Sequence, residues 1–211
     1  YSYKNKIKIG SSIISLNNEK SEFNFKKNQN LFEFNYFDKK DNKTFSYNGK
    51  LFFKPFYSII KGDIDKLNIS FVLNSNSIIT QLLKTEIFNN KNLNINFNLS
   101  SKKILNYNNF VNILLNCKIK EGLIDIDDTQ FDWKNRANVR LFNSLIFIKD
   151  GELILDANTQ IRITNYIEVY KFFQSPKKLR KKIKKIDLNF TYNFDKKIIN
   201  INEVKIDNKS N

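Results

Sequence analysis

Strict alternation of apolar and polar residues recurs along this chain and limits its fold to one built on β-sheet. In the clearest case, Leu93, Ile95, Phe97 and Leu99 alternate with asparagines. Successive side chains of a strand point to opposite faces of the sheet, so a period of two places each apolar set on one face. The same period recurs at 45–53, 67–73 and 111–119. We therefore expect a mainly β protein with on the order of a dozen strands.

Turn residues separate several of these expected strands. Asp150-Gly151 lies between apolar runs at 145–148 and 153–155, which predicts a hairpin because glycine tolerates a positive φ. The polar residues 195–197 predict a second hairpin, and Glu121-Gly122 predicts a turn before the next apolar run.

Two segments depart from the period of two and have the spacing of short amphipathic helices. Residues 77–88 form the first, with Ser75 or Asn76 as its N-cap, and residues 165–174 form the second, ended by Ser175-Pro176. Helices this short cannot cover the apolar face of about a dozen strands. The missing layer is a second sheet, closure of the sheet on itself, or a bound apolar ligand.

Residues that support catalysis or metal binding are scarce. The chain has no histidine and one cysteine, Cys117, which excludes Ser-His and Cys-His nucleophile pairs and a zinc site. The acidic run 125–132 departs from a calcium loop, because Gln130 and Arg136 occupy the positions that need glycine and an acid. Cys117 and Trp133 are expected to serve in packing. We expect no enzyme, no cofactor and no metal site.

The formal net charge of +15 would normally suggest a polyanionic partner. Lysine, asparagine and isoleucine are, however, unusually frequent, and their AT-rich codons explain the charge without such a partner. The basic run 177–185 is interpreted first as a solvated connector. Its alternatives are contact with anionic lipid headgroups through Lys177, Lys178, Arg180, Lys181 and Lys182, and nucleic-acid binding. Nucleic acid is disfavoured because no aromatic residues interleave with the basic ones.

The order of several motifs is more specific than composition. The motifs run from Glu121-Gly122-Leu123 through Phe131-Asp132-Trp133-Lys134 and Asp150-Gly151-Glu152 to Gln174-Ser175-Pro176-Lys177-Lys178, and end in Ile186-Asp187-Leu188-Asn189-Phe190. This order resembles the C-terminal region of the AsmA-like family of bacterial envelope proteins. Residues 49–56 and 62–67 are similar to a strand pair of the same family. The resemblance covers about 45–211. The whole chain, 1–211, lacks methionine and opens in mid-pattern, so we expect a single β-rich segment of a larger protein.

The resemblance implies a periplasmic protein, held in the bacterial inner membrane by an anchor outside this segment. It implies a long curved antiparallel sheet or open β-groove with two short amphipathic helices, and a non-enzymatic role in phospholipid transfer and outer-membrane biogenesis. Phospholipid acyl chains would then supply the missing layer. The groove residues expected are Leu93, Ile95, Phe97, Leu99, Val111, Ile113 and Leu115. The alternative is a structural or protein-interaction β module of the envelope without a lipid ligand.

Overall fold

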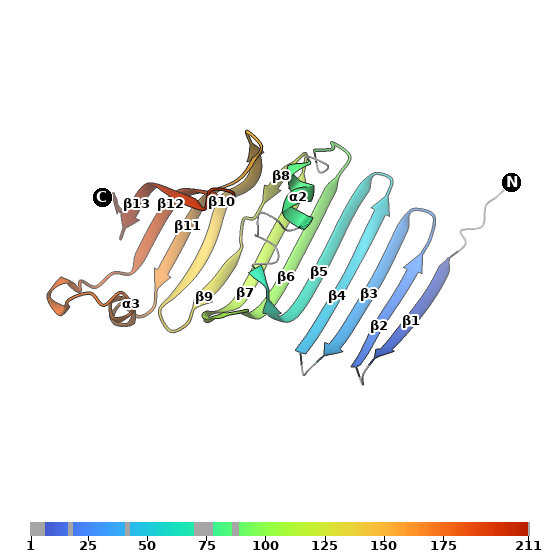
Figure 1. The fold of residues 1–211 in the computed structure, drawn as a ribbon, viewed down its shortest axis with the longest axis horizontal. Helices are drawn as coiled ribbons and strands as arrows, with labels where there is room; N and C mark the ends of the chain where they lie inside the picture. The colour runs from blue at the N-terminus through green and yellow to red at the C-terminus, as the bar shows by residue number, and fades with distance from the viewer. Residues whose placement is uncertain (1–6, 17–18, 41–42, 70–77, 86–88, 211) are drawn as a thin grey trace.

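The chain folds around one large β-sheet (Figure 1), which confirms the mainly β prediction. A computed structural model describes residues 7–16, 19–40, 43–69, 78–85 and 89–210. The sheet has fourteen strands. They are β1 (Lys8–Leu16), β2 (Glu19–Lys27), β3 (Leu31–Lys40), β4 (Lys43–Phe53), β5 (Phe56–Leu67), β6 (Asn94–Ile104), β7 (Tyr107–Lys120), β8 (Leu123–Asp125), β9 (Gln130–Trp133), β10 (Ala137–Lys149), β11 (Glu152–Ile163), β12 (Lys185–Asn193), β13 (Ile198–Ile206) and β14 (Lys209–Ser210).

The strands lie in the sheet almost in the order in which the chain forms them. The short strands β8 and β9 share the place between β7 and β10, and β1 and β14 end the sheet. Strands β5 and β6 are parallel, and every other described pairing is antiparallel. A parallel pair needs a long crossover, and the connection between β5 and β6, which contains helix α2 (Ile78–Lys84), provides it.

The structure has a turn at each of the predicted positions. Asp150 and Gly151 join β10 to β11 with φ angles of 53° and 76°, which is the backbone of a tight two-residue hairpin. Glu121 and Gly122 join β7 to β8 with φ angles of 52° and 79°. The turn that contains Asp195 joins β12 to β13.

The helices are shorter than predicted, and only α2 lies over the sheet in the part of the chain that the structure describes (Figure 1). The expected N-caps of the first helix, Ser75 and Asn76, lie outside the described residues. Helix α3 (Tyr166–Phe172) begins after the cap residue Asn165, whose side chain accepts a hydrogen bond from the backbone N–H of Glu168. It has no buried residue and lies at one end of the sheet (Figure 1), so it adds no covering layer.

The strand register sorts side chains into two faces. Cross-strand partners on one side, from β2 to β7, are Phe25, Phe34, Gly49, Ile60, Phe97 and Cys117. Their sequence neighbours form a parallel row on the other side: Asn24, Asn35, Asn48, Lys61, Asn98 and Asn116. We name these sides the apolar face and the polar face.

Two glycines on the apolar face make room for large side chains. A Cβ atom at Gly49 would lie 2.6 Å from Cε1 of Phe34, and one at Gly62 would lie 2.7 Å from Cδ1 of Leu99. Real Cβ atoms do not approach so closely, so the missing side chains let neighbouring residues lie over the backbone.

The buried core lies on the apolar face of β5, β6 and β7. Its cluster consists of Ile64, Leu67, Leu99, Ile104 and Ile113. Phe45, Tyr47, Phe97, Phe110, Leu115 and Phe131 pack around it. The rest of this face is mostly half-buried, because the sheet is a single layer over most of its length (Figure 1).

Candidate functional site

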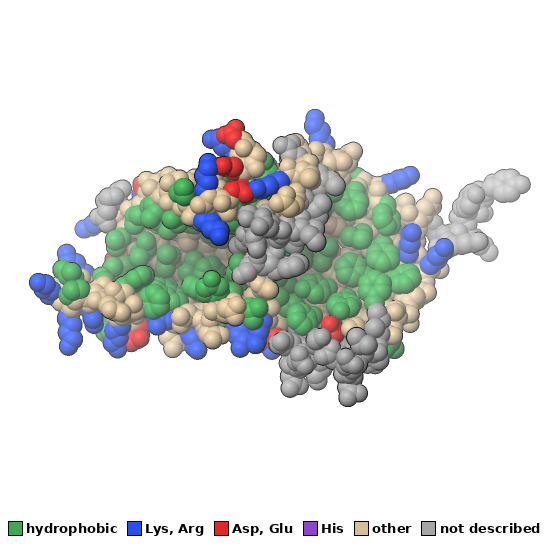
Figure 2. All heavy atoms as spheres, viewed as in Figure 1, with side chains coloured by type: hydrophobic (Ala, Val, Ile, Leu, Met, Phe, Trp, Pro, Cys, Tyr) green, Lys and Arg blue, Asp and Glu red, His purple; other side chains and the backbone are tan. Residues whose placement is uncertain are grey.

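The apolar face is the candidate site, because it continues across ten strands and the described residues form no second sheet over it. One row of cross-strand partners runs from β3 to β13. Its members are Phe32, Leu51, Ser58, Ile95, Ile119, Ile124, Ile146, Leu155, Tyr192 and Ile199. We name this set the long apolar row. Figure 2 shows hydrophobic side chains spread over this face from the β1–β5 end to the β12–β13 end.

Most members of the long apolar row are partly accessible. Ser58 and Ile124 are buried, Ile199 is exposed, and the others are half-buried. Side chains in such a row can therefore be contacted from the open side of the sheet. Contact of this kind would remove further apolar area from water, which is favourable by about 25 cal/mol per Å².

The predicted groove residues lie close together but differ in accessibility. Ile95, Phe97 and Leu99 share the apolar face of β6, where they pair with Ile119, Cys117 and Leu115 of β7. Leu99 and Ile113 are only 6% and 4% exposed and belong to the buried cluster. The half-buried members are Leu93, Ile95, Phe97, Val111 and Leu115.

A β-bulge interrupts the alternation at Val111. The register of β7 with β9 shifts between Val111 and Leu114, where Asn112 has a φ of 53°. As a result Val111 pairs with Asp132, and Phe110 rather than Val111 packs against the buried cluster. The period of two in the sequence could not reveal this, because an inserted residue changes the face without changing the pattern.

Two hollows of the described structure lie apart from the predicted groove residues. A hollow of about 740 Å³ spreads over β1 to β5, lined by side chains of the polar face that include Asn24, Asn35, Asn48 and Lys61. A smaller one of about 180 Å³ lies where Leu83 of α2 meets Ile124 and Leu153 of the apolar face. At β1 to β5, concave volume therefore lies on the polar side.

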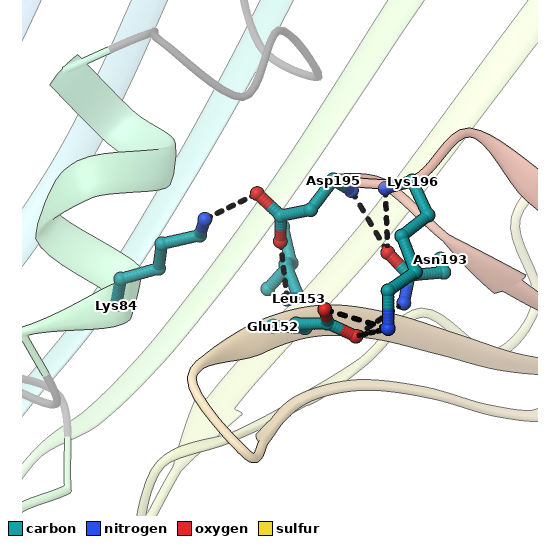
Figure 3. Close-up of polar contacts among 6 residues, drawn as sticks. All are labelled: Lys84, Glu152, Leu153, Asn193, Asp195 and Lys196. Atoms are coloured by element: carbon teal, nitrogen blue, oxygen red, sulfur yellow. Dashed lines mark hydrogen bonds and ion pairs between the residues drawn. The ribbon is translucent and has the colours of Figure 1, made fainter.

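An ion pair fastens α2 to the far part of the sheet (Figure 3). Lys84 Nζ donates to Asp195 Oδ1, and the backbone N–H of Leu153 donates to Asp195 Oδ2 at 2.9 Å. The hydrogen bond from Lys84, followed by that from Leu153, lowers the pKa of Asp195 below its usual value of 3.8. Sequence reasoning missed this pair, because nothing local links residues 111 positions apart.

Beside Asp195, a second charged group holds the same turn (Figure 3). Glu152 accepts hydrogen bonds from Asn193 Nδ2 at 2.7 Å and from Lys196 Nζ at 2.9 Å. These contacts lower the pKa of Glu152, with the Lys196 hydrogen bond as the largest cause. The turn that receives Lys84 is therefore itself fixed to the start of β11.

Aromatic residues connect the sheet to α3. Trp133, at the end of β9, contacts Phe172 and Phe173 edge-on, with ring centroids 5.1 and 5.9 Å apart. The guanidinium of Arg136 lies 5.3 Å from the Trp133 ring centroid and 5.1 Å from that of Phe172. Trp133 thus serves in packing, as predicted, at the junction of helix and sheet.

The basic run follows α3 and contains the short 3-10 helix η1 (Lys177–Leu179). Lys177, Lys178, Lys181 and Lys182 are exposed. Arg180 is half-buried and donates from Nε and one terminal nitrogen to the backbone oxygen of Ser175, at 3.0 and 2.9 Å. The structure therefore places the four lysines at the surface and uses Arg180 to fold the connection.

Three further observations concern the described residues. No three His, Cys, Asp or Glu side chains gather there in a way that could hold a metal ion. Burial, with a smaller effect of Asp125, raises the pKa of the Cys117 thiol to about 11. Among the helices in that part of the chain, none has the length and apolar character that a membrane span requires.

Comparison with known protein families gave no match, and neither the curated proteins nor the solved structures gave one.

Proposed function

We propose that this chain is a non-enzymatic segment of a bacterial envelope protein similar to the AsmA-like family, and that its apolar face holds phospholipid acyl chains during lipid transfer. The supporting observation is the long apolar row, which crosses β3 to β13 on the side that only α2 covers among the described elements. The periplasmic location, the inner-membrane anchor outside the segment and the role in outer-membrane biogenesis belong to the same proposal.

The energetics of acyl-chain binding suit a surface of this kind. Each methylene group that leaves water contributes roughly 0.8 kcal/mol. A long chain therefore needs no dedicated polar site, and a row of aliphatic and aromatic side chains suffices. Such a surface would select for apolar chains and not for a particular headgroup.

Photo-crosslinking tests the proposal with matched controls on the same strands. A benzophenone amino acid replaces Ile95 or Tyr192 on the apolar face, or their sequence neighbours Asn96 and Thr191 on the polar face. All four residues are half-buried, so they differ mainly in the face they occupy. The protein is crosslinked in phospholipid vesicles and analysed by mass spectrometry. Lipid adducts at Ile95 and Tyr192 alone support the proposal, and equal adducts at all four positions contradict it.

A second candidate function is a protein-interaction module of the envelope, favoured by the outer edge of β13. The short β14 pairs only with Lys205 and Ile206, so residues 198–203 have no partner on that side within the described chain. Ile198, Ile199 and Ile201 are about half exposed there. An open apolar edge can accept another strand, and binding of a protein strand without any lipid adduct would favour this function.

A further inference from the structure

The α3–η1 connection projects beyond the sheet and combines exposed apolar side chains with a basic stretch that contains no acidic residue. We name residues 166–184 the tip (Figure 1). Ile167, Phe172, Phe173 and Leu179 are 44%, 49%, 64% and 59% exposed there. Large apolar side chains rarely gather at a protruding end unless they meet a partner.

Charge at the tip is almost entirely positive. Between Glu168 and Asp187 the sequence holds eight basic residues and no acidic one. Glu168 is already paired with Lys171, 2.8 Å away. No ion pair described for this chain includes the exposed lysines of the tip, which are Lys177, Lys178, Lys181, Lys182 and Lys184.

The local structure presents Leu179 and the lysines together. The two hydrogen bonds from Arg180 to the backbone oxygen of Ser175 close a short loop around η1. Within this loop Leu179 follows Lys177 and Lys178 and precedes Lys181 and Lys182. Figure 2 shows basic side chains around hydrophobic ones at this end of the molecule.

We propose that the tip docks on an anionic lipid bilayer. Phe173 and Leu179 enter the boundary between headgroups and acyl chains, and the surrounding lysines contact lipid phosphates. Apolar side chains ringed by lysines have the composition of segments that lie in the membrane interface. An anionic leaflet attracts each nearby lysine, and the attraction falls off within a Debye length.

A nucleic acid would fit the same charge but not the same apolar residues. Single-stranded binding sites stack bases on aromatic faces. At the tip, no aromatic residue stands among the basic residues 177–185, and Phe172 and Phe173 both precede them in the chain. The apolar residues within that stretch, the exposed Leu179 and the half-buried Ile183, are aliphatic and offer no ring for a base.

The tip also continues the apolar face. Phe110 and Phe131, which pack on the buried cluster, contact each other edge-on at 5.5 Å, and Trp133 follows Phe131 by two residues on the same strand face. Docking would thus turn this end of the apolar face toward the bilayer. This orientation rests on the proposed function, whereas docking itself does not.

Vesicle flotation tests the docking. The chain is mixed with vesicles of phosphatidylcholine alone, or of equal parts phosphatidylcholine and phosphatidylglycerol. The tip variant carries Lys177→Gln, Lys178→Gln, Lys181→Gln and Lys182→Gln. The control variant loses the same charge from exposed lysines elsewhere, through Lys61→Gln, Lys91→Gln, Lys120→Gln and Lys149→Gln. We expect the tip variant to bind the anionic vesicles at least about tenfold more weakly than the control variant.

Insertion of Leu179 is measured separately with an environment-sensitive fluorophore. Cys117 is half-buried and burial raises the pKa of its thiol to about 11, so at neutral pH a label reacts preferentially with the exposed thiol of a Leu179→Cys variant. Anionic vesicles should shift its emission to the blue, and a label at Leu114→Cys on the polar face should not respond. The docking would be overturned if the tip and control variants bound the vesicles equally, or if the label at position 179 showed no shift. It would also be overturned if the tip bound DNA but not vesicles. Lipid adducts at Ile95 are measured in a separate crosslinking experiment. A failure of docking can therefore be distinguished from a failure of lipid binding to the apolar face.

Discussion

Lys84 and Asp195 form an ion pair that joins helix α2 to the turn between β12 and β13 across the apolar face. The two side chains are 23% and 21% exposed, so water screens the pair only partly. A helix of seven residues is not stable in isolation. The position of α2 over the sheet therefore depends on this pair and on the side chains that α2 turns toward the sheet, among them Leu83, which lines a small hollow with Ile124 and Leu153.

Removing the pair should release α2 without unfolding the sheet. Lys84→Met removes the cation and keeps much of the apolar side chain, so we expect a loss of about 1 kcal/mol in unfolding free energy. Hydrogen exchange of the amides at 78–85 should accelerate, while exchange in β10 and β11 should stay unchanged. Lys149→Met, an exposed lysine outside the described ion pairs, is the control. Unchanged exchange in α2 would show that the helix is held by packing alone.

The same pair makes stability depend on pH in a defined window. The pKa of Asp195 is lower in the folded chain than its usual 3.8, so the folded state favours the charged carboxylate. Its contribution is complete well above pH 3.8 and is lost as the pH falls through the lowered pKa. The difference in melting temperature between the wild type and Asp195→Asn should therefore be present at neutral pH and shrink toward pH 2. A difference independent of pH would contradict this origin.

The close approach of Phe34 to Gly49 predicts a strong effect of one added methyl group. In Gly49→Ala the new Cβ would meet Phe34 at 2.6 Å and the backbone oxygen of Ile59 at 3.0 Å. The ring can move but the backbone cannot easily do so, and we expect a loss of about 1 to 3 kcal/mol in urea unfolding. Gly151→Asn is the control, since no atom lies within 4 Å of the new Cβ and asparagine tolerates its φ of 76°.

Asp127, in the acidic run 125–132, supports the bulge in β10 between Phe142 and Leu145. Its Oδ1 accepts a hydrogen bond from the backbone N–H of Ser144 at 2.7 Å. The fully buried Ser144 hydroxyl in turn bonds to the backbone of Phe142 and Asn158. Asp127→Ala should leave the Ser144 N–H unpaired and cost about 1 to 3 kcal/mol. Asp127→Asn keeps an oxygen acceptor and should cost clearly less by the same denaturation measurement.

Cys117 should report how tightly its half-buried side chain is packed on the apolar face. Burial raises its thiol pKa to about 11, so little reactive thiolate exists at pH 8. We expect slow reaction with a disulfide reagent in buffer and fast reaction in urea. The rate follows from the absorbance of the released thiolate. Fast reaction of the native chain at pH 8 would show that the apolar face opens around Phe97 and Cys117.

The sequence predicted those features that depend on residues close together in the chain. The alternation at 93–99 correctly placed Ile95, Phe97 and Leu99 on one face of β6. Asp150-Gly151 marked its hairpin because the chemistry of a two-residue turn lies within the turn itself. Each of these features depends on residues only a few positions apart.

Features that depend on residues far apart in the chain could not be predicted from the sequence. The parallel pairing of β5 with β6 depends on the path of the connection that contains α2. No short sequence pattern predicts that path. The pairing of Lys84 with Asp195 and the hydrogen bond of Asp127 to Ser144 join residues 111 and 17 positions apart. Charged residues at such positions look like ordinary surface residues in a single sequence, so their roles emerged only from the fold.

The open edge of β13 predicts self-association of the isolated chain. Residues 198–203 lack a partner on their outer side within the described sheet, and Ile199 and Ile201 are 53% and 59% exposed. An unpaired strand that presents apolar side chains readily pairs with another copy, and an inserted lysine opposes this by charge repulsion and solvation. We expect the double variant Ile199→Lys and Ile201→Lys to sediment as a monomer at concentrations where the wild type associates. Leu114→Lys and Leu145→Lys, which add equal charge at exposed leucines inside the sheet, should leave association unchanged. If both pairs of substitutions abolished association equally, net charge and not the β13 edge would control it.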